Sequence, residues 1–294
     1  MTLTPSRPLH TGPADRYDAL ARASAALVIR RYSSSFALAS RLLPEPVRSH
    51  VRNVYALVRV ADELVDAPRP GTGPAAQLAL LDQLEAEVER ALLTGHSANL
   101  VVHAFAGTAA VSGIGRDLTG PFFASMRADL DPTAHDQASF ERYVHGSAEV
   151  IGLMCLRVFL VGERDPATSY AALAPGAQAL GAAFQKINFL RDLAEDAALL
   201  GRRYFPGIDP ARLTDSQRDA LLDDIARDLA TAAPAVAGLP ASCRRPVQVA
   251  HALFAELARR LRATPASEIR RRRVRVPGPA KAGVLIRCLV RGDR

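Results

Sequence analysis

The chain has 294 residues, of which 49% are hydrophobic, and carries a formal net charge of +7. A chain of this length and hydropathy buries about three quarters of its unfolded surface and is typical of a globular protein. The sequence has no apolar run long enough for a transmembrane helix and no secretory signal, and its three scattered cysteines indicate neither a disulfide framework nor a zinc site. We therefore expect a globular protein of the cytoplasm.

Helical periodicity dominates the chain and strand-like alternation is nearly absent, which predicts one all-α domain with its active site in the centre. Residues 1–16 are rich in proline and glycine, so we expect a disordered lead-in there and the domain over residues 17–294. Proline and glycine mark most helix ends. In chain order, helices are predicted at residues 17–31, 46–67, 74–93, 98–112, 120–130, 140–161, 167–200, 215–232, 242–263 and 280–289.

One polar stripe organises the rest of the chain. Within the segment QKINFLRDLAED, the residues Gln185, Asn188, Asp192 and Asp196 share a helix face at spacings of three, four and four. The other faces are largely apolar, so the helix is expected to be buried. Two buried carboxylates about 6 Å apart along the axis repel one another. A hard cation such as Mg²⁺ relieves that repulsion, because it binds carboxylate oxygens and substrate phosphate.

A second pair of aspartates repeats the four-residue spacing. Asp62 and Asp66 lie in another apolar helical segment, and Tyr55 and Arg59 precede Asp62 on its face. A single pair of this kind is more often a solvated acidic face. Two pairs that face each other predict a cage of four carboxylates around a diphosphate bridged by Mg²⁺.

These motifs resemble the squalene/phytoene synthase family. Tyr55-x3-Arg59-x2-Asp62-x3-Asp66 and Gln185-x2-Asn188-x2-Arg191-Asp192-x3-Asp196 carry the resemblance. Ser33–Phe36, Tyr143–Gly152 and Gly201–Pro206 are similar to further segments of the family, and the resemblance extends over about residues 23–273. The chain departs from the pattern at His145, where many relatives have an aromatic residue, and at Glu63, which follows Asp62 in place of a second aspartate. The resemblance implies an isoprenoid-synthase-type helical bundle.

The resemblance also implies a reaction, the head-to-head condensation of two allylic prenyl diphosphates through a cyclopropyl diphosphate. In that reaction Asp62, Asp66, Asp192 and Asp196 would hold Mg²⁺, or Mn²⁺ in its place. Arg59 and Arg191 would bind diphosphate oxygens, because guanidinium binds phosphate through two parallel hydrogen bonds; the alternative is a plain ion pair with the neighbouring aspartates. Further roles near the substrate fall to Tyr143, Tyr204, Gln185, Asn188, Ser33, Phe36 and Arg203.

Small residues accompany both halves of the predicted site. Ala177 and Gly181 precede the second aspartate motif, and Gly146–Gly152 form another small-residue stretch. Close helix packing is the simpler interpretation of such residues. An enzyme that joins two prenyl chains also needs an apolar tunnel, so the resemblance favours a tunnel lined here, with Phe36 and Phe184 in its wall.

The positive charge gathers late in the chain, at Arg270–Arg273 and beyond. No recognition motif supports nucleic-acid binding, and a solvated tail is the simplest explanation. An anionic membrane surface suits the charge better than nucleic acid does, and it suits an enzyme with an insoluble product. Arg273 is a further candidate for the second diphosphate. The oligomeric state has no sequence signal.

Three functions remain open from the sequence. The leading one is phytoene-synthase-type condensation of two geranylgeranyl diphosphates in carotenoid biosynthesis. The alternative within the family is a squalene or dehydrosqualene synthase that uses farnesyl diphosphate and needs NADPH if the product is squalene. A catalytically inactive helical scaffold is the third, and the two complete aspartate motifs count against it.

Overall fold

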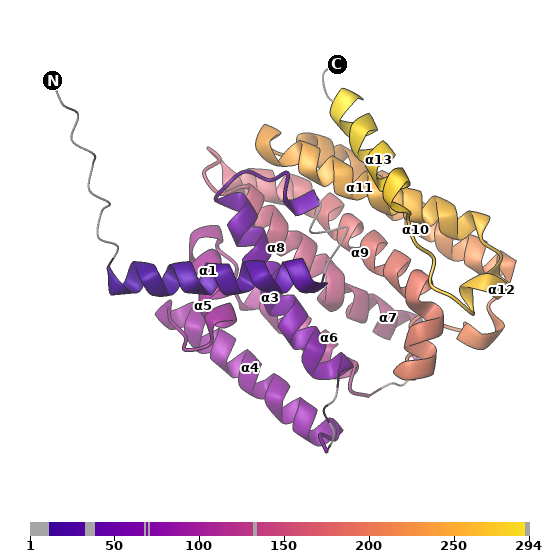
Figure 1. Cartoon of the computed structure of the whole chain (residues 1–294), viewed down its shortest axis with the longest axis horizontal. Coiled ribbons are helices and arrows are strands. Elements are labelled where there is room, and N and C mark those ends of the chain that lie inside the picture. The colour runs from indigo at the N-terminus through magenta and orange to yellow at the C-terminus, as the bar shows by residue number, and fades with distance from the viewer. Residues whose placement is uncertain (1–11, 33–38, 68, 70, 132–133, 292–294) are drawn as a thin grey trace.

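The computed structural model describes residues 12–32, 39–67, 69, 71–131 and 134–291, which contain helices and no strand (Figure 1). The prediction of a single all-α domain is confirmed. The helices are α1 (Pro13–Tyr32), α3 (Val47–Asp66), α4 (Pro74–Thr94), α5 (Leu100–Ser112), α6 (Arg116–Ala128), α7 (Gln137–Val144), the π-helical turn η1 (His145–Glu149), α8 (Val150–Phe159), α9 (Pro166–Leu199), the 3₁₀ turn η2 (Pro210–Arg212), α10 (Asp215–Gly238), α11 (Ala241–Ala263), α12 (Ala266–Ile269) and α13 (Gly278–Arg291).

Local capping explains where several of these helices begin and end. The side chain of Asn99 accepts hydrogen bonds from two backbone N–H groups at the start of α5. Thr214 and Gln217 form a reciprocal capping box at the start of α10. Gly95 and Gly113 follow α4 and α5 with φ of 70°, a left-handed conformation that glycine adopts without steric cost.

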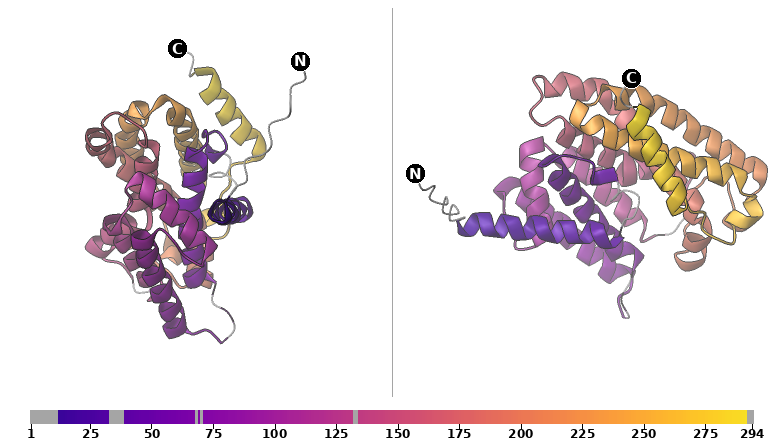
Figure 2. Two further views of the ribbon diagram at one scale, coloured as in Figure 1. Left: turned by 90° about the vertical axis from the view of Figure 1, so that its left-hand side faces the viewer. Right: turned by 45° about the horizontal axis from the view of Figure 1, so that its top comes forward.

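The 34-residue helix α9 runs through the middle of the molecule (Figures 1 and 2). On one side, the buried residues of α3, α4, α5, α6 and α8 form a large apolar core. On the other, α9 packs with α7, α10, α11 and α12 around a second core that includes Ile187, Leu190 and Leu193. Residues from α9 therefore contact both halves, and this arrangement brings the second aspartate motif to the centre. No helix in the described ranges is both long and apolar enough to cross a membrane.

Glycines allow α8 and α9 to approach closely. A Cβ atom on Gly152 would lie 2.4 Å from the carbonyl oxygen of Ala177, and one on Gly181 would lie 2.6 Å from the carbonyl oxygen of Ala148. Both distances are too short for any larger residue without a shift of the backbone. Close packing is thus a real role of these small residues.

The helices differ from the predicted ones in several places. Helix α1 begins at Pro13, inside the predicted lead-in, and α6 begins at Arg116 because Gly115 and not Gly120 precedes its first turn. The predicted helix 140–161 is interrupted by the π-helical turn His145–Glu149. Helix α12 was missed because four residues show no periodicity. The first eleven residues of the predicted lead-in lie outside the described residues.

Candidate active site

The two aspartate motifs lie on α3 and α9 and face each other across the centre of the bundle. Burial and the neighbouring charge of Asp66 raise the pKa of Asp62 to about 7. Burial and the charge of Asp192 likewise raise the pKa of Asp196 to about 7, and Asp66 on the opposite helix adds to that shift. The carboxylates of the two motifs are therefore close enough to repel one another.

A buried arginine links the motifs, because the backbone N–H of Arg202 donates a hydrogen bond of 3.3 Å to the carbonyl oxygen of Asp196 while its side chain pairs with Asp66. Nη1 of Arg202, in the loop after α9, lies 2.7 Å from Oδ1 of Asp66, and its Nε lies 3.3 Å from Oδ1 of Asp129 at the end of α6. Burial lowers the pKa of Arg202, but Asp129, Tyr204 and Asp66 outweigh that effect and raise it. Neither contact has hydrogen-bond alignment, since Asp66 Oδ1 and Arg202 Nε have no hydrogen-bond partner among the described residues. Arg202 therefore partly neutralises the carboxylates of Asp66 and Asp129 without satisfying the hydrogen-bonding capacity of Asp66 Oδ1.

Two tyrosines border this ion-pair network. The Tyr143 hydroxyl donates a hydrogen bond of 2.7 Å to Oδ1 of Asp129, and the rings of Tyr143 and Tyr204 both stack on Phe189. Burial raises the pKa of both hydroxyl groups above its ordinary value, and Asp129 adds to this effect. Both hydroxyls therefore stay protonated near neutral pH and can donate hydrogen bonds.

The arginines predicted to bind diphosphate make ion pairs with nearby carboxylates. Arg191 is paired with Asp192. Nε of Arg273, in the segment between α12 and α13, lies 2.8 Å from Oδ1 of Asp192, an oxygen that Arg191 also contacts. Arg59 is paired with Glu63, and its Nη1 lies 3.9 Å from Asp62. The plain ion-pair alternative accordingly describes these contacts.

The donor chemistry between the motifs fits a hard divalent cation. Oδ1 of Asn188 is buried and has no hydrogen-bond partner in the described part of the chain. Burial and then the neighbouring carboxylates raise the pKa values of Asp62 and Asp196, and a bound cation would relieve that repulsion. In the described ranges no three histidine, cysteine or acidic side chains converge into a compact metal cluster. These residues could hold Mg²⁺ only together with substrate oxygens that complete its coordination.

An apolar cavity of about 220 Å³ lies along α9, on the N-terminal side of the second aspartate motif. Ala177, Gly181, Phe184 and Gln185 line it on α9, and Gly152 lines it on α8. The ring of Phe184 stacks on Phe254 with a centroid distance of 3.8 Å, and Nε2 of Gln185 lies 3.4 Å from Oγ of Ser147. The small residues therefore both pack closely and border a space of suitable chemistry for a prenyl chain.

Not every sequence prediction falls at this site. Arg203 is exposed, whereas its neighbour Arg202, which was not among the predicted site residues, is buried. Asp129 was also missed, because a single aspartate at a helix end has no motif around it. Tyr55 is partly buried on α3 and lies on the same helix face as Asp62. Ser33 and Phe36 lie outside the described residues.

Comparison with known proteins agrees with this geometry. The chain is 30% identical over 281 residues to 15-cis-phytoene synthase of a Paracoccus species, covering 87% of each chain. It is 30% identical to presqualene diphosphate synthase of Sinorhizobium fredii, covering 76% of this chain and 72% of that protein. The match to chloroplastic phytoene synthase 1 of Zea mays, at 30% identity, spans only 46% of that protein's length.

Solved structures show the same fold. A crystal structure of a dehydrosqualene synthase in complex with ligand superposes with a TM-score of 0.78 at 21% identity, covering 96% of this chain and 99% of that chain. The family model for squalene/phytoene synthase matches residues 29–280. With two facing aspartate motifs beside an apolar cavity, the chain belongs to the squalene/phytoene synthase family.

Proposed function

We propose that the protein is a prenyltransferase that condenses two geranylgeranyl diphosphates head to head, through a cyclopropyl (prephytoene) diphosphate, to phytoene in carotenoid biosynthesis. The observation that supports this most strongly is the position of the apolar cavity directly along α9 from the two facing aspartate motifs. A diphosphate and its hydrocarbon chain require that combination. The phytoene synthases among its relatives favour phytoene formation over the other reactions of the family.

The charged end of the site would bind the diphosphates. Asp62, Asp66, Asp192 and Asp196, with Asn188, would hold Mg²⁺ (or Mn²⁺), which when bound neutralises the negative charge that grows on the leaving diphosphate. Arg59 and Arg191 would exchange their carboxylate partners for diphosphate oxygens, and Arg273 would do the same for the second substrate. Each exchange keeps the guanidinium paired, so the cost of burying its charge is met in both states.

The apolar end of the site would protect the reacting carbons. Loss of diphosphate leaves an allylic cation that water would capture, so the cavity lined by Ala177, Gly181 and Phe184 must exclude water. Gln185 lies where this cavity meets the polar stripe and would line the path of the cation. Tyr143, held by Asp129, would present its hydroxyl oxygen at the same boundary.

A squalene or dehydrosqualene synthase that uses farnesyl diphosphate is the second candidate. Its support is the structural likeness to a dehydrosqualene synthase over nearly the whole chain. NADPH enters only if squalene is the product. Whichever chain length applies, a water-soluble substrate head and an insoluble hydrocarbon product favour a cytoplasmic protein that works in peripheral contact with the inner face of the membrane.

The test is to supply the purified protein with geranylgeranyl or farnesyl diphosphate and Mg²⁺, with and without NADPH, and to identify the hydrocarbon by mass spectrometry. We expect phytoene from geranylgeranyl diphosphate without NADPH. A product formed only from farnesyl diphosphate would establish the second candidate. No product from either substrate, with the protein folded and Mg²⁺ bound, would contradict both.

A further inference from the structure

Three of the four arginines in the run Arg270–Arg273 make contacts within the protein. Arg270 donates a hydrogen bond of 2.8 Å to the carbonyl oxygen of Ala211. Arg272 is paired with Glu268, and Arg273 with Asp192. An external anion would have to displace these partners to bind there.

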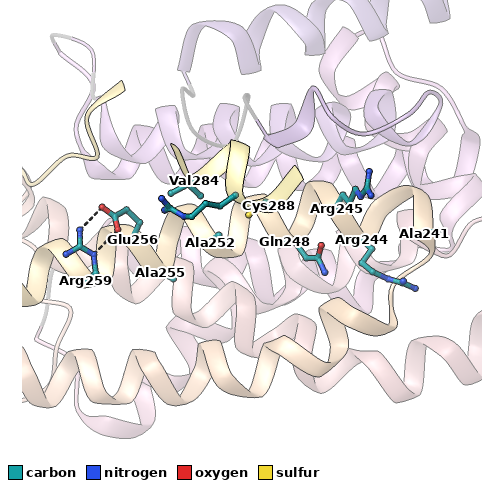
Figure 3. Close-up of a pocket in the computed structure, with 11 residues that line it drawn as sticks. Ala241, Arg244, Arg245, Gln248, Ala252, Ala255, Glu256, Arg259, Val284 and Cys288 are labelled. Atoms are coloured by element: carbon teal, nitrogen blue, oxygen red, sulfur yellow. Dashed lines mark hydrogen bonds and ion pairs between the residues drawn. The ribbon is translucent and has the colours of Figure 1, made fainter. Parts of the chain in front are cut away.

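A groove of about 860 Å³ between α11 and α13 gathers other arginines (Figure 3). Arg244, Arg245 and Arg259 line it from α11, and Arg287 lines it from α13. One carboxylate, that of Glu256, is present, and it is paired with Arg259 and Arg260. The groove therefore carries an excess of positive charge.

The groove also has an apolar component. Ala252 and Ala255 on α11 and Val284 on α13 form part of its lining. Beside it, Ile286 is 59% exposed on α13. That helix contains Lys281, Arg287 and Arg291 and no acidic residue. A short basic helix with an exposed aliphatic side chain has the character of an interfacial helix.

Helix α1 presents a second surface of the same kind. Arg16, Leu20, Ala23, Leu27 and Arg30 recur at spacings of four, three, four and three, and all are exposed. Leu20 is 53% and Leu27 is 48% exposed. In the left view of Figure 2, α1 and α13 lie on the same side of the molecule although they come from opposite ends of the chain.

We propose that this side is a membrane-docking surface, in which the arginines between α11 and α13 bind the phosphate of an acidic phospholipid while α13 and the outer face of α1 rest on the bilayer. Guanidinium matches phosphate oxygens in a bidentate geometry. A free phosphate ion would contact only the arginines of the groove. A lipid bilayer would also cover the exposed side chains of Ile286, Leu20 and Leu27. The exposed aliphatic side chains thus favour a lipid over a soluble anion.

The position of α11 gives this surface a functional meaning. The opposite face of α11, through Pro246, Val247 and Ala250, lines the apolar cavity. One helix therefore separates the docking groove from the proposed prenyl site. The short distance between membrane and prenyl site matters only if the proposed function is correct. Binding of the groove to lipid does not depend on that function, so the two can be tested separately.

The test is co-sedimentation with vesicles of phosphatidylglycerol and phosphatidylcholine, compared with phosphatidylcholine alone. Wild type should bind the anionic vesicles, less strongly as salt rises. The double variant Arg245→Gln/Arg287→Gln, which takes one arginine from each helix, should bind them about tenfold or more weakly. Ile286→Ser should weaken binding to a smaller extent. All variants should keep the wild-type melting temperature.

Matched controls separate a specific surface from general charge. Arg212 and Arg227 have side chains 88% and 72% exposed, and the pair Arg212→Gln/Arg227→Gln removes the same charge outside the groove. Leu93→Ser, at a leucine of α4 that is 88% exposed, is the apolar control. These controls should bind as wild type does. An equal loss in both arginine pairs, or no binding of wild type to anionic vesicles, would overturn the proposal.

A calorimetric arm with inorganic phosphate identifies the remaining alternative. If the groove variant loses affinity for inorganic phosphate and keeps its affinity for vesicles, the groove is a site for a soluble anion and the lipid proposal is wrong. Product formation from detergent-dispersed substrate should be the same in wild type and groove variant. Loss of vesicle binding with intact turnover therefore supports the docking surface, and absence of turnover in both proteins concerns only the proposed reaction.

Discussion

The two aspartate motifs have the same spacing in the sequence and different partners in the structure. On α3, Asp66 lies 2.7 Å from the guanidinium of Arg202, while Asp62 has only a distant contact of 3.9 Å with Arg59. On α9 the order is reversed, because Asp192 is held by Arg191 and Arg273, and no ion pair is recorded for Asp196 in the described residues.

Each motif therefore contains one carboxylate neutralised by arginine and one with a pKa raised to about 7, Asp62 on α3 and Asp196 on α9. Aspartates with the same spacing on two helices therefore have different electrostatic environments. We infer that the arginine-paired member contributes more to the stability of the fold around the site, and that the other member would be the more strongly stabilised by a bound cation. Substitutions that treat the two members differently can break or sharpen this distinction.

The largest effect is expected from the carboxylates with raised pKa values. Asp62→Asn or Asp196→Asn should reduce turnover at least a thousandfold, about 4 kcal/mol of transition-state stabilisation, while the melting temperature without metal stays level or rises because repulsion is relieved. Asp192→Asn should also reduce turnover, but it should lower the melting temperature because Arg191 and Arg273 lose a partner. Steady-state kinetics, Mg²⁺ titration and melting curves measure these outcomes. Wild-type turnover with an unchanged Mg²⁺ midpoint in Asp62→Asn would refute the metal cage.

Next in size is the arginine that links the motifs. Arg202→Met leaves Asp129 buried without its cation, so the free energy of unfolding should fall by about 3 kcal/mol, the lower end for breaking a buried pair because Asp66 is partly exposed. The exposed neighbour offers a matched control, and Arg203→Met should change stability by about 0.5 kcal/mol or less. Urea denaturation gives both values. Equal effects of the two substitutions would show that Arg202 does not link the motifs.

A smaller effect is expected at the apolar end of the site. Ala177→Phe should cost about 1–3 kcal/mol through overpacking and shift preference from geranylgeranyl towards farnesyl diphosphate, because the added ring fills the cavity. Ala232→Phe, at a buried alanine that does not line the cavity, is the control for destabilisation alone. Competition between the two diphosphates, with melting curves, tests this. An unchanged product ratio in a destabilised Ala177→Phe protein would make Ala177 a packing residue only.

The smallest effect concerns pH. Folding raises the pKa of Asp62 and of Asp196 from 3.8 to about 7, so the folded protein holds protons that the unfolded chain has already released. Their contribution to stability is therefore present below pH 3.8 and is lost as pH rises to about 7. The double variant Asp62→Asn/Asp196→Asn should show a flatter dependence of the melting temperature on pH over this interval. Saturating Mg²⁺ should act in the same direction, because it binds the deprotonated groups. Parallel pH profiles in variant and wild type would contradict this assignment.

The helices were largely predictable because most of them bury one face and show its periodicity, and because proline and glycine mark most of their ends. The polar stripe on α9 and the pair on α3 were predictable for the same reason, since spacing on a helix fixes which side chains are neighbours. The π-helical turn at His145–Glu149 was not, because it depends on one additional residue fitting between fixed neighbours rather than on composition.

Loop residues of the site lay beyond this kind of reasoning. Arg202 and Arg203 are consecutive and chemically identical, and only the path of the chain after α9 decides which of them turns inward. Asp129 becomes meaningful only when tertiary packing brings the end of α6 beside Tyr143 and Arg202. Arg273 was a candidate in the sequence, but its pairing with Asp192 joins parts of the chain about eighty residues apart. Contacts of this kind have no local signal.

The continuity of α9 also constrains how the protein can diverge. Because the cavity lining and the second aspartate motif share one helix, the distance from Gly181 to Asp192 is set in whole residues, at about 1.5 Å and 100° each. A single insertion between them would turn the carboxylates of Asp192 and Asp196 away from α3 by more than a quarter of a turn. Any insertion that changed the length of prenyl chain accepted by the cavity would also disrupt the cage of four carboxylates. We therefore expect substrate size to change through the volume of individual side chains. The number of residues on α9 between Gly181 and Asp192 should stay constant.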